Sequence, residues 1–282
     1  MQTITDPKKL QAQCLAWRRE GLTIGLVPTM GYFHEGHLAL MDRARPDCDK
    51  LIVTLFVNPT QFGENEDLDK YPHDFEGDSA KAESHGSDLL FAPEKTAMYD
   101  GTHATWVDVP ELGRHLCGAS RPGHFKGVCT VVTKLFMLSQ PDIAVFGQKD
   151  WQQLAIIRRM VRDLNIPVKV IGHPIIREPD GLAMSSRNAY LTVEERNAAP
   201  AIQKGLVKMA EMVKKGERSA KAARAFLSNE YASSLPMGKV DYIEIVAPDT
   251  VEPVDQITGP TLAAVAVFIG KARLIDNILI EV

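Results

Sequence analysis

Short aliphatic runs alternate with stretches of helical spacing through the first two-thirds of the chain. The runs are nearly continuous in apolar residues, which is typical of parallel strands covered on both faces. They predict strands over residues 22–27, 51–57, 88–91, 143–146 and 168–172. The stretches between them predict helices over residues 7–20, 37–45, 74–85, 127–138 and 151–164. This alternation indicates an α/β fold with a doubly wound parallel sheet.

The pattern changes after about residue 176. A polar, turn-rich segment at 177–181 leads to a capping box at 192–195 and to a helix predicted over 201–215. The remaining apolar runs predict strands over 240–246, 262–269 and 278–282. We therefore expect a first domain over residues 1–176 and a smaller α+β domain over 177–282.

The composition narrows the possible partners. The 282 residues carry a formal net charge of −4, which provides no general attraction to nucleic acid or to anionic lipid. The apolar runs are shorter than the roughly 20 residues that cross a bilayer, and the first residues lack the pattern of a signal peptide. The four cysteines have no metal-binding spacing, so we expect small buried thiols. We predict a soluble, cytoplasmic protein with no nucleic-acid or membrane partner.

The segment after the first predicted strand holds two histidines, His34 and His37, at the start of a helix. The first N–H groups of a helix are free and its dipole is positive there, so anions bind well. Imidazole N–H groups add donors, and the segment therefore predicts a site for the phosphates of a nucleotide. Two other interpretations stay open: an ordinary helix start, and a metal pair, for which no third ligand stands at a recognisable spacing.

Further polar segments lie where other predicted strands end. Residues 58–62 follow the second strand, and residues 147–150 follow the fourth. Ligands of doubly wound sheets bind at the carboxyl ends of the strands, so these segments are expected to border one crevice. The loop 184–188 offers two hydroxyls and a guanidinium to phosphate oxygens. Ser-Ser-Arg alone is common on solvated loops, and only its combination with the histidine turn indicates function.

Five segments with distinctive sequences occur in order along the chain, at 27–31, 56–62, 118–125, 146–150 and 184–188. On these segments the chain resembles the pantothenate synthetase (pantoate–β-alanine ligase) family of the nucleotidylyltransferase superfamily. Members of the superfamily pair a HIGH-type element, here His34–His37, with a KMSKS-type element, here Met184–Arg187. The similarity extends from about residue 22 to residue 195, with a weaker match at residues 274–277.

The resemblance implies a Rossmann-like fold and a two-step ligation in the biosynthesis of pantothenate and coenzyme A. The carboxylate of pantoate would attack the α-phosphate of ATP, releasing pyrophosphate and leaving pantoyl adenylate. The amine of β-alanine would then attack the acyl carbon, giving pantothenate and AMP. ATP is the implied co-substrate, Mg²⁺ would neutralise its triphosphate, and the family forms homodimers. A carboxylate is already ionised near neutral pH, so the first step needs alignment and charge stabilisation rather than a base.

Matching the motifs of the family position by position assigns a role to each candidate. The catalytic residues would be His34, His37 and Lys149, with His37 as proton donor and Lys149 as phosphate cation. The contacts to ATP would come from Met30, Gly31, Tyr32, Phe33, His34, Glu35, Gly36, His37, Gly147, Gln148, Lys149, Asp150, Ile176, Met184, Ser185, Ser186 and Arg187. The contacts to pantoate and β-alanine would come from Gln61, Gln153, Asn58 and Tyr71. Arg121 and His124 are expected to line the same cleft, and no residue is assigned to a metal.

Two other functions remain open on the sequence. Another nucleotidylyltransferase would transfer a nucleotide to a phosphate or an alcohol, but an acceptor phosphate calls for cations where Gln61 and Gln153 are neutral. A nucleotide sensor or a tRNA-binding protein on the same fold could dispense with His37, and a tRNA binder would need a basic face. The pattern favours the ligase.

Overall fold

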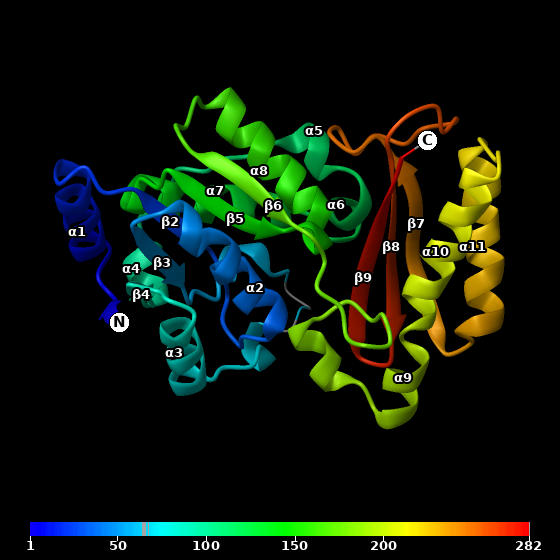
Figure 1. Cartoon of the computed structure of the whole chain (residues 1–282), viewed down its shortest axis with the longest axis horizontal. Coiled ribbons are helices and arrows are strands. Elements are labelled where there is room, and N and C mark those ends of the chain that lie inside the picture. The colour runs from blue at the N-terminus through cyan, green and yellow to red at the C-terminus, as the bar shows by residue number, and fades with distance from the viewer. Residues whose placement is uncertain (64–65, 67, 282) are drawn as a thin grey trace.

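Six parallel strands form the larger of two sheets, in the order β1-β4-β3-β2-β5-β6 (Figure 1). The computed structural model describes residues 1–63, 66 and 68–281. The strands are β1 Gln2–Ile4, β2 Ile24–Val27, β3 Lys50–Thr54, β4 Leu89–Phe91, β5 Ile143–Gly147 and β6 Lys169–His173. The chain order reverses beside β2, because β3 pairs with one of its edges and β5 with the other. A reversal of this kind leaves a crevice at the carboxyl ends of the strands.

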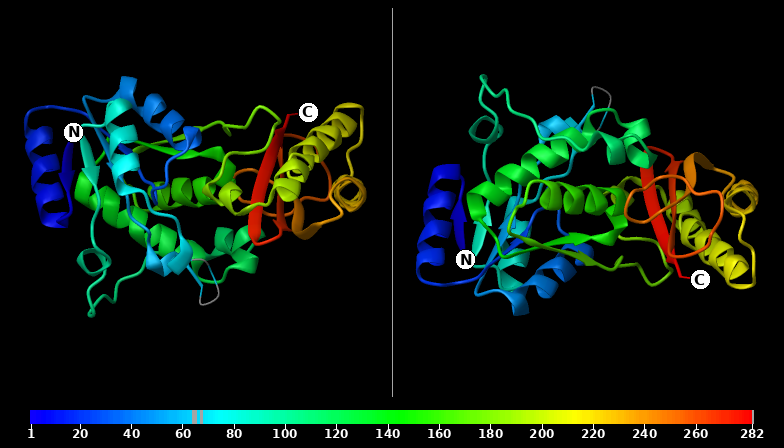
Figure 2. Two further views of the ribbon diagram at one scale, coloured as in Figure 1. Left: turned by 90° about the horizontal axis from the view of Figure 1, so that it is seen from below. Right: turned by 90° about the horizontal axis from the view of Figure 1, so that it is seen from above.

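Helices cover both faces of this sheet, as the two side views show (Figure 2). One face carries α1 Pro7–Arg19, α7 His124–Ser139 and α8 Trp151–Asp163, and the other carries α2 Glu35–Ala44 and α3 Phe75–Ser84. The short helices α4 Lys95–Met98, α5 Pro110–Gly113 and α6 Leu116–Ser120 lie in the connection between β4 and α7. The predicted doubly wound, Rossmann-like α/β fold is confirmed.

The four central strands, β2 to β5, are apolar on both faces because each contributes to two cores. In β2, Ile24 and Leu26 pack with α1, α7 and α8, whereas Val27 packs with α2 and α3. Strand β3 alternates in the same way, with Ile52 in the first core and its neighbours Leu51 and Val53 in the second. This two-residue alternation follows from the pleat of a strand, and two buried faces explain the continuous aliphatic runs of the sequence.

A smaller antiparallel sheet follows, in the order β7-β8-β9. Its strands are β7 Gly238–Val246, β8 Thr261–Ile269 and β9 Ala272–Ile280, and its helices are α9 Val193–Ala198, α10 Ala201–Lys214 and α11 Ala220–Ser234. A third core joins this sheet to α10 and α11. Leu262 and Ala264, on the other face of β8, pack instead with the core of the large sheet. The predicted smaller α+β part is therefore present, and the domain division after residue 176 stays a prediction.

Some elements differ from the sequence prediction. Strand β1 and helix α11 were not predicted, and β9 begins at Ala272 rather than at the predicted residue 278. Polar side chains interrupt the apolar pattern of β9 at Arg273, Asp276 and Asn277. The last residue of the predicted strand, Val282, lies outside the described part of the chain. Within that part, no helix is long and apolar enough to cross a membrane.

Candidate active site

The turn from β2 into α2 brings His34 and His37 together. His34 is the N-cap of α2, and its ring Nδ1 accepts a hydrogen bond from the Gly36 N–H at 3.1 Å. The ring Nδ1 of His37 accepts in turn from the His34 N–H at 3.4 Å, and the two ring centroids lie 4.1 Å apart. A neutral imidazole that accepts at Nδ1 carries its proton at Nε2. Each ring therefore keeps one N–H donor free of these backbone contacts.

Both histidines are held in the neutral form. Burial, followed by the nearby charge of Lys149, lowers the pKa of His34 to about 4. Burial, together with His34 and Lys149, holds the pKa of His37 well below its ordinary value. The pair can therefore stabilise negative charge near neutral pH as uncharged N–H donors rather than as imidazolium cations.

Lys149 stands at the carboxyl end of β5, in the 3₁₀ turn Gln148–Asp150. It is half-buried, and burial lowers the pKa of its ammonium, against the opposing effect of Asp150. Asn277 of β9 donates from Nδ2 to the carbonyl oxygens of Gln148 and Lys149, at 3.0 Å each. The small sheet thus holds the backbone from which the Lys149 side chain extends.

Asp276, the residue before Asn277 in β9, links the small sheet to Arg177 in the segment after β6. Asp276 is buried, and its two oxygens accept from the Arg177 guanidinium at 2.7 Å and 2.9 Å. A bidentate pair of this kind fixes direction as well as distance. In the sequence, residues 274–277 match the family only weakly, and this match gives no role to Asp276 or Asn277.

The loop that follows Arg177 lies against the histidine turn. The Ser186 hydroxyl donates to the Tyr32 carbonyl oxygen at 3.5 Å, and a Cβ placed on Gly36 would lie 3.8 Å from the Cβ of Met184. The Met184 N–H donates to the Ile176 carbonyl oxygen at 3.0 Å, which closes the base of the loop. The HIGH-type and KMSKS-type elements predicted from sequence, which lie far apart in the chain, are therefore in contact.

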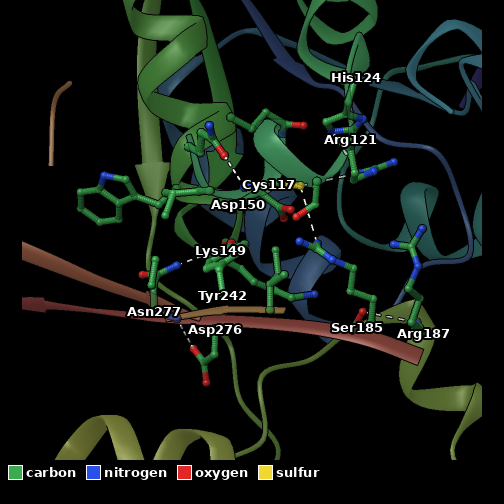
Figure 3. Close-up of a pocket in the computed structure, with 18 of the residues that line it drawn as sticks. Cys117, Arg121, His124, Lys149, Asp150, Ser185, Arg187, Tyr242, Asp276 and Asn277 are labelled. Atoms are coloured by element: carbon green, nitrogen blue, oxygen red, sulfur yellow. Dashed lines mark hydrogen bonds between the residues drawn. The ribbon is translucent and has the colours of Figure 1, made fainter. Parts of the chain in front are cut away.

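A cavity of about 920 Å³ opens between the two sheets beside this junction (Figure 3). Of the residues predicted to bind substrates, Lys149, Asp150, Gln153, Ser185 and Arg187 line it. The residues of the histidine turn and Gln61 are not among the described residues of its wall. Tyr242, Asp276 and Asn277 bring the small sheet to the cavity wall. The predicted site is therefore spread over the cavity and the adjoining turn rather than gathered in one hollow.

Gln61 contacts Met30, which precedes the histidine turn. Its Nε2 donates to the Met30 Sδ at 3.0 Å, and its Oε1 accepts from the Asn58 Nδ2 at 3.2 Å. Asn58 is 1% exposed and also donates to the Gly127 carbonyl oxygen at 3.1 Å. Tyr71 is buried as well. Asn58 therefore supports Gln61, and the Asn58 amide already donates its hydrogen bonds within the protein.

Arg121 and His124 form a polar network on the cavity wall. Arg121 pairs with Glu66 and contacts the His124 Nε2 at 3.2 Å, and the His124 Nδ1 lies 2.7 Å from the Gln61 carbonyl oxygen. Burial and the Arg121 charge lower the pKa of His124 to about 4. The network therefore links the cavity to the backbone of Gln61. Arg121 and His124 both line the cavity, as expected from the sequence.

Two residues of α3 that hold the histidine turn could not be recognised from the sequence. Asp78 accepts from the backbone N–H groups of Tyr32 and Phe33, and Lys81 donates to the Phe33 carbonyl oxygen. Both lie on α3, far from the turn in the sequence. A pair of charged residues on an amphipathic helix is common and does not indicate a functional site. Among the described residues, no group of three histidine, cysteine or acidic side chains is placed to hold a metal ion.

The chain is similar to known proteins over nearly its whole length. A family model described as pantoate-beta-alanine ligase matches residues 2–279. Curated relatives named pantothenate synthetase include those from Maridesulfovibrio salexigens, at 62% identity, and Heliobacterium modesticaldum, at 52%, each matched over the full length of both chains.

Solved structures give the same result. Pantothenate synthetase from Thermus thermophilus is 44% identical, with 100% of both chains covered and a TM-score of 0.94. The ligase from Francisella tularensis, complexed with beta-gamma ATP and β-alanine, is 31% identical with a TM-score of 0.80, and 99% of this chain and 97% of that one are covered. The chain is thus an enzyme that belongs to the pantoate–β-alanine ligase family, whose members form pantothenate from pantoate and β-alanine.

Proposed function

We propose that this enzyme joins pantoate to β-alanine in two steps, through a pantoyl adenylate made from ATP. The observation that carries the proposal is the contact between the His34–His37 turn and the loop at 184–188, beside Lys149 and the cavity. We propose that the neutral N–H donors of the turn, the hydroxyls of the loop and the Lys149 and Arg187 cations bind the triphosphate where the turn adjoins the cavity. The related Francisella tularensis enzyme, complexed with beta-gamma ATP, supports ATP as the nucleotide.

In the first step, a carboxylate oxygen of pantoate attacks the α-phosphorus of ATP. The bond from that phosphorus to the bridging oxygen of pyrophosphate breaks, and pyrophosphate leaves with the electron pair. The Nε2–H groups of His34 and His37, the Lys149 ammonium and the Arg187 guanidinium stabilise the charge that builds on the leaving oxygens. Asp150, Ser185 and Ser186 complete the ATP site that we propose.

In the second step, the amine of β-alanine attacks the acyl carbon of the adenylate. The bond from that carbon to the AMP oxygen breaks, AMP leaves, and the nitrogen gives up a proton. Gln153, on the cavity wall, and Gln61, beside Met30, are proposed to hold pantoate, because amides can bind both its hydroxyls and its carboxylate. The buried Asn58 is proposed to orient Gln61, and Tyr71 to close the wall behind it.

The proposal extends to the surroundings of the reaction. ATP would enter as its Mg²⁺ complex, and the Asp150 carboxylate at the cavity is an acidic group available to contact the ion. The enzyme is proposed to act in the cytoplasm as a homodimer, with the nucleotide between residues 1–176 and the domain from 177 onward.

Exchange of labelled pyrophosphate into ATP tests this function. The reversible first step predicts exchange that requires pantoate and proceeds without β-alanine. Lactate and a phosphorylated acceptor such as 4-phosphopantetheine serve as controls and should give no exchange. Exchange that ignores pantoate, or that responds to the phosphorylated acceptor, would instead identify another nucleotidylyltransferase.

A further inference from the structure

A carboxylate from a distant helix holds the turn that precedes the two histidines. Asp78 of α3 is 2% exposed, and its oxygens accept from the N–H groups of Tyr32 and Phe33 at 2.6 Å each. Gly31 and Tyr32 have left-handed backbones, with φ of +91° and +55°. Successive N–H groups beside left-handed residues form a concavity that binds anions. Here the anion in that concavity is a side chain of the protein itself.

Lys81, one helical turn beyond Asp78, contacts the same turn. Its Nζ donates to the Phe33 carbonyl oxygen at 2.8 Å. A Cβ on Gly31 would come to 3.0 Å from the Asp78 carboxylate, so glycine permits the close approach. Helix α3 therefore binds both the N–H and the C=O of Phe33, the residue immediately before His34.

The position of Phe33 controls the position of the histidine rings. The His34 N–H that follows it donates to the His37 ring, and the His34 ring caps α2. Without the carboxylate, two N–H groups in a buried turn would lack acceptors, and the turn would rearrange to find new ones. A misplacement of about 1 Å at reacting groups lowers rates by on the order of 100-fold.

We propose that Asp78, assisted by Lys81, is a positioning residue that sets the geometry of the His34–His37 pair and hence the rate of adenylation. The proposal rests on the proposed function for the reaction that the pair serves. It also assigns the ATP contacts of the turn to the ring N–H groups, because Asp78 already uses the N–H groups of Tyr32 and Phe33.

Asp78→Asn tests this assignment, because it keeps the size of the side chain and turns one acceptor into a donor. We expect the kcat of pantoate-dependent pyrophosphate exchange to fall about 10- to 100-fold, with KM values for ATP and pantoate within about threefold of the original. The ¹⁵N NMR signals of the His34 and His37 rings should shift. Lys81→Met should also lower kcat, by a smaller factor. This variant tests the proposal if Asp78→Asn does not fold.

Asp74→Asn is the matched control. Asp74 caps the same helix by accepting from the Gly77 N–H at 3.0 Å, and within the described part of the chain it has no hydrogen bond to the turn. The substitution keeps the cap, because an asparagine oxygen accepts the same hydrogen bond, and it should leave kcat and the ring signals unchanged. Equal losses of kcat in the two aspartate variants, or unchanged kcat in Asp78→Asn, would overturn the proposal. If the unmodified enzyme shows no pantoate-dependent exchange, the proposed function fails, and the NMR comparison still tests the positioning.

Discussion

Lys149→Met is expected to slow pantoate-dependent pyrophosphate exchange by about 1000-fold. Methionine keeps the apolar stem but removes the cation at the end of β5. Lys149 is half-buried at the cavity, and its charge reaches His34 and His37 strongly enough to lower the pKa of both. Water screens such a charge weakly, so its loss removes much of the stabilisation of the leaving pyrophosphate.

Lys126→Met is the control for Lys149→Met. The Lys126 ammonium lies 5.0 Å from the centre of the Trp106 ring, and neither residue is part of the described cavity wall. Exchange should stay within about twofold of the original in this variant. A Lys149→Met enzyme with nearly unchanged exchange would show that the triphosphate binds elsewhere.

His37→Ala is expected to reduce turnover by on the order of 100-fold or more and to keep ATP affinity within about tenfold. The ring Nε2–H acts on charge that develops during the reaction, so its loss affects the rate more than binding. Single-turnover measurement of pyrophosphate release, with ATP binding measured separately by calorimetry, divides the two effects. His85→Ala is the control, because His85 pairs with Asp42 on the surface. Unchanged turnover in His37→Ala would remove its proposed role.

The neutral state of the two histidines also predicts how the rate of pyrophosphate exchange depends on pH. Because burial places the pKa of His34 at about 4 and that of His37 well below its ordinary value, neither ring gains a proton between about pH 8 and pH 5.5. Exchange should therefore show no histidine step near pH 6.5 in that range. On the alkaline side, Lys149 loses its charge as the pH rises through its pKa, which burial lowers, so the decline should begin earlier than for an exposed lysine.

Much of the large sheet could be predicted because its strands are buried on both faces. Runs such as 22–27 and 143–146 are nearly continuous in apolar residues, which is typical of a covered parallel strand. Helix α11 and the first half of β9 lack such a signal. In β9, Asp276 and Asn277 are polar because they bind Arg177 and the backbone of Lys149, which are contacts between distant parts of the chain.

The residues of the candidate site that could be predicted from the sequence are those that belong to short motifs. The contact between Ser186 and Tyr32 joins two such motifs. The supporting groups were not predictable, because Asp78 and Lys81 act through backbone atoms of a turn far away in the sequence. Neither has a neighbouring residue that marks it as part of a site. Only the packing of α3 against the turn reveals their position.

Transfer of oxygen from pantoate to AMP tests the adenylate intermediate most directly. Pantoate labelled with ¹⁸O in its carboxylate is incubated with the enzyme, ATP and β-alanine, and the AMP and pantothenate are examined by mass spectrometry. If the carboxylate attacks the α-phosphorus, each AMP acquires one labelled oxygen and the amide carbonyl of pantothenate keeps the other. Unlabelled AMP formed together with pantothenate would contradict the account.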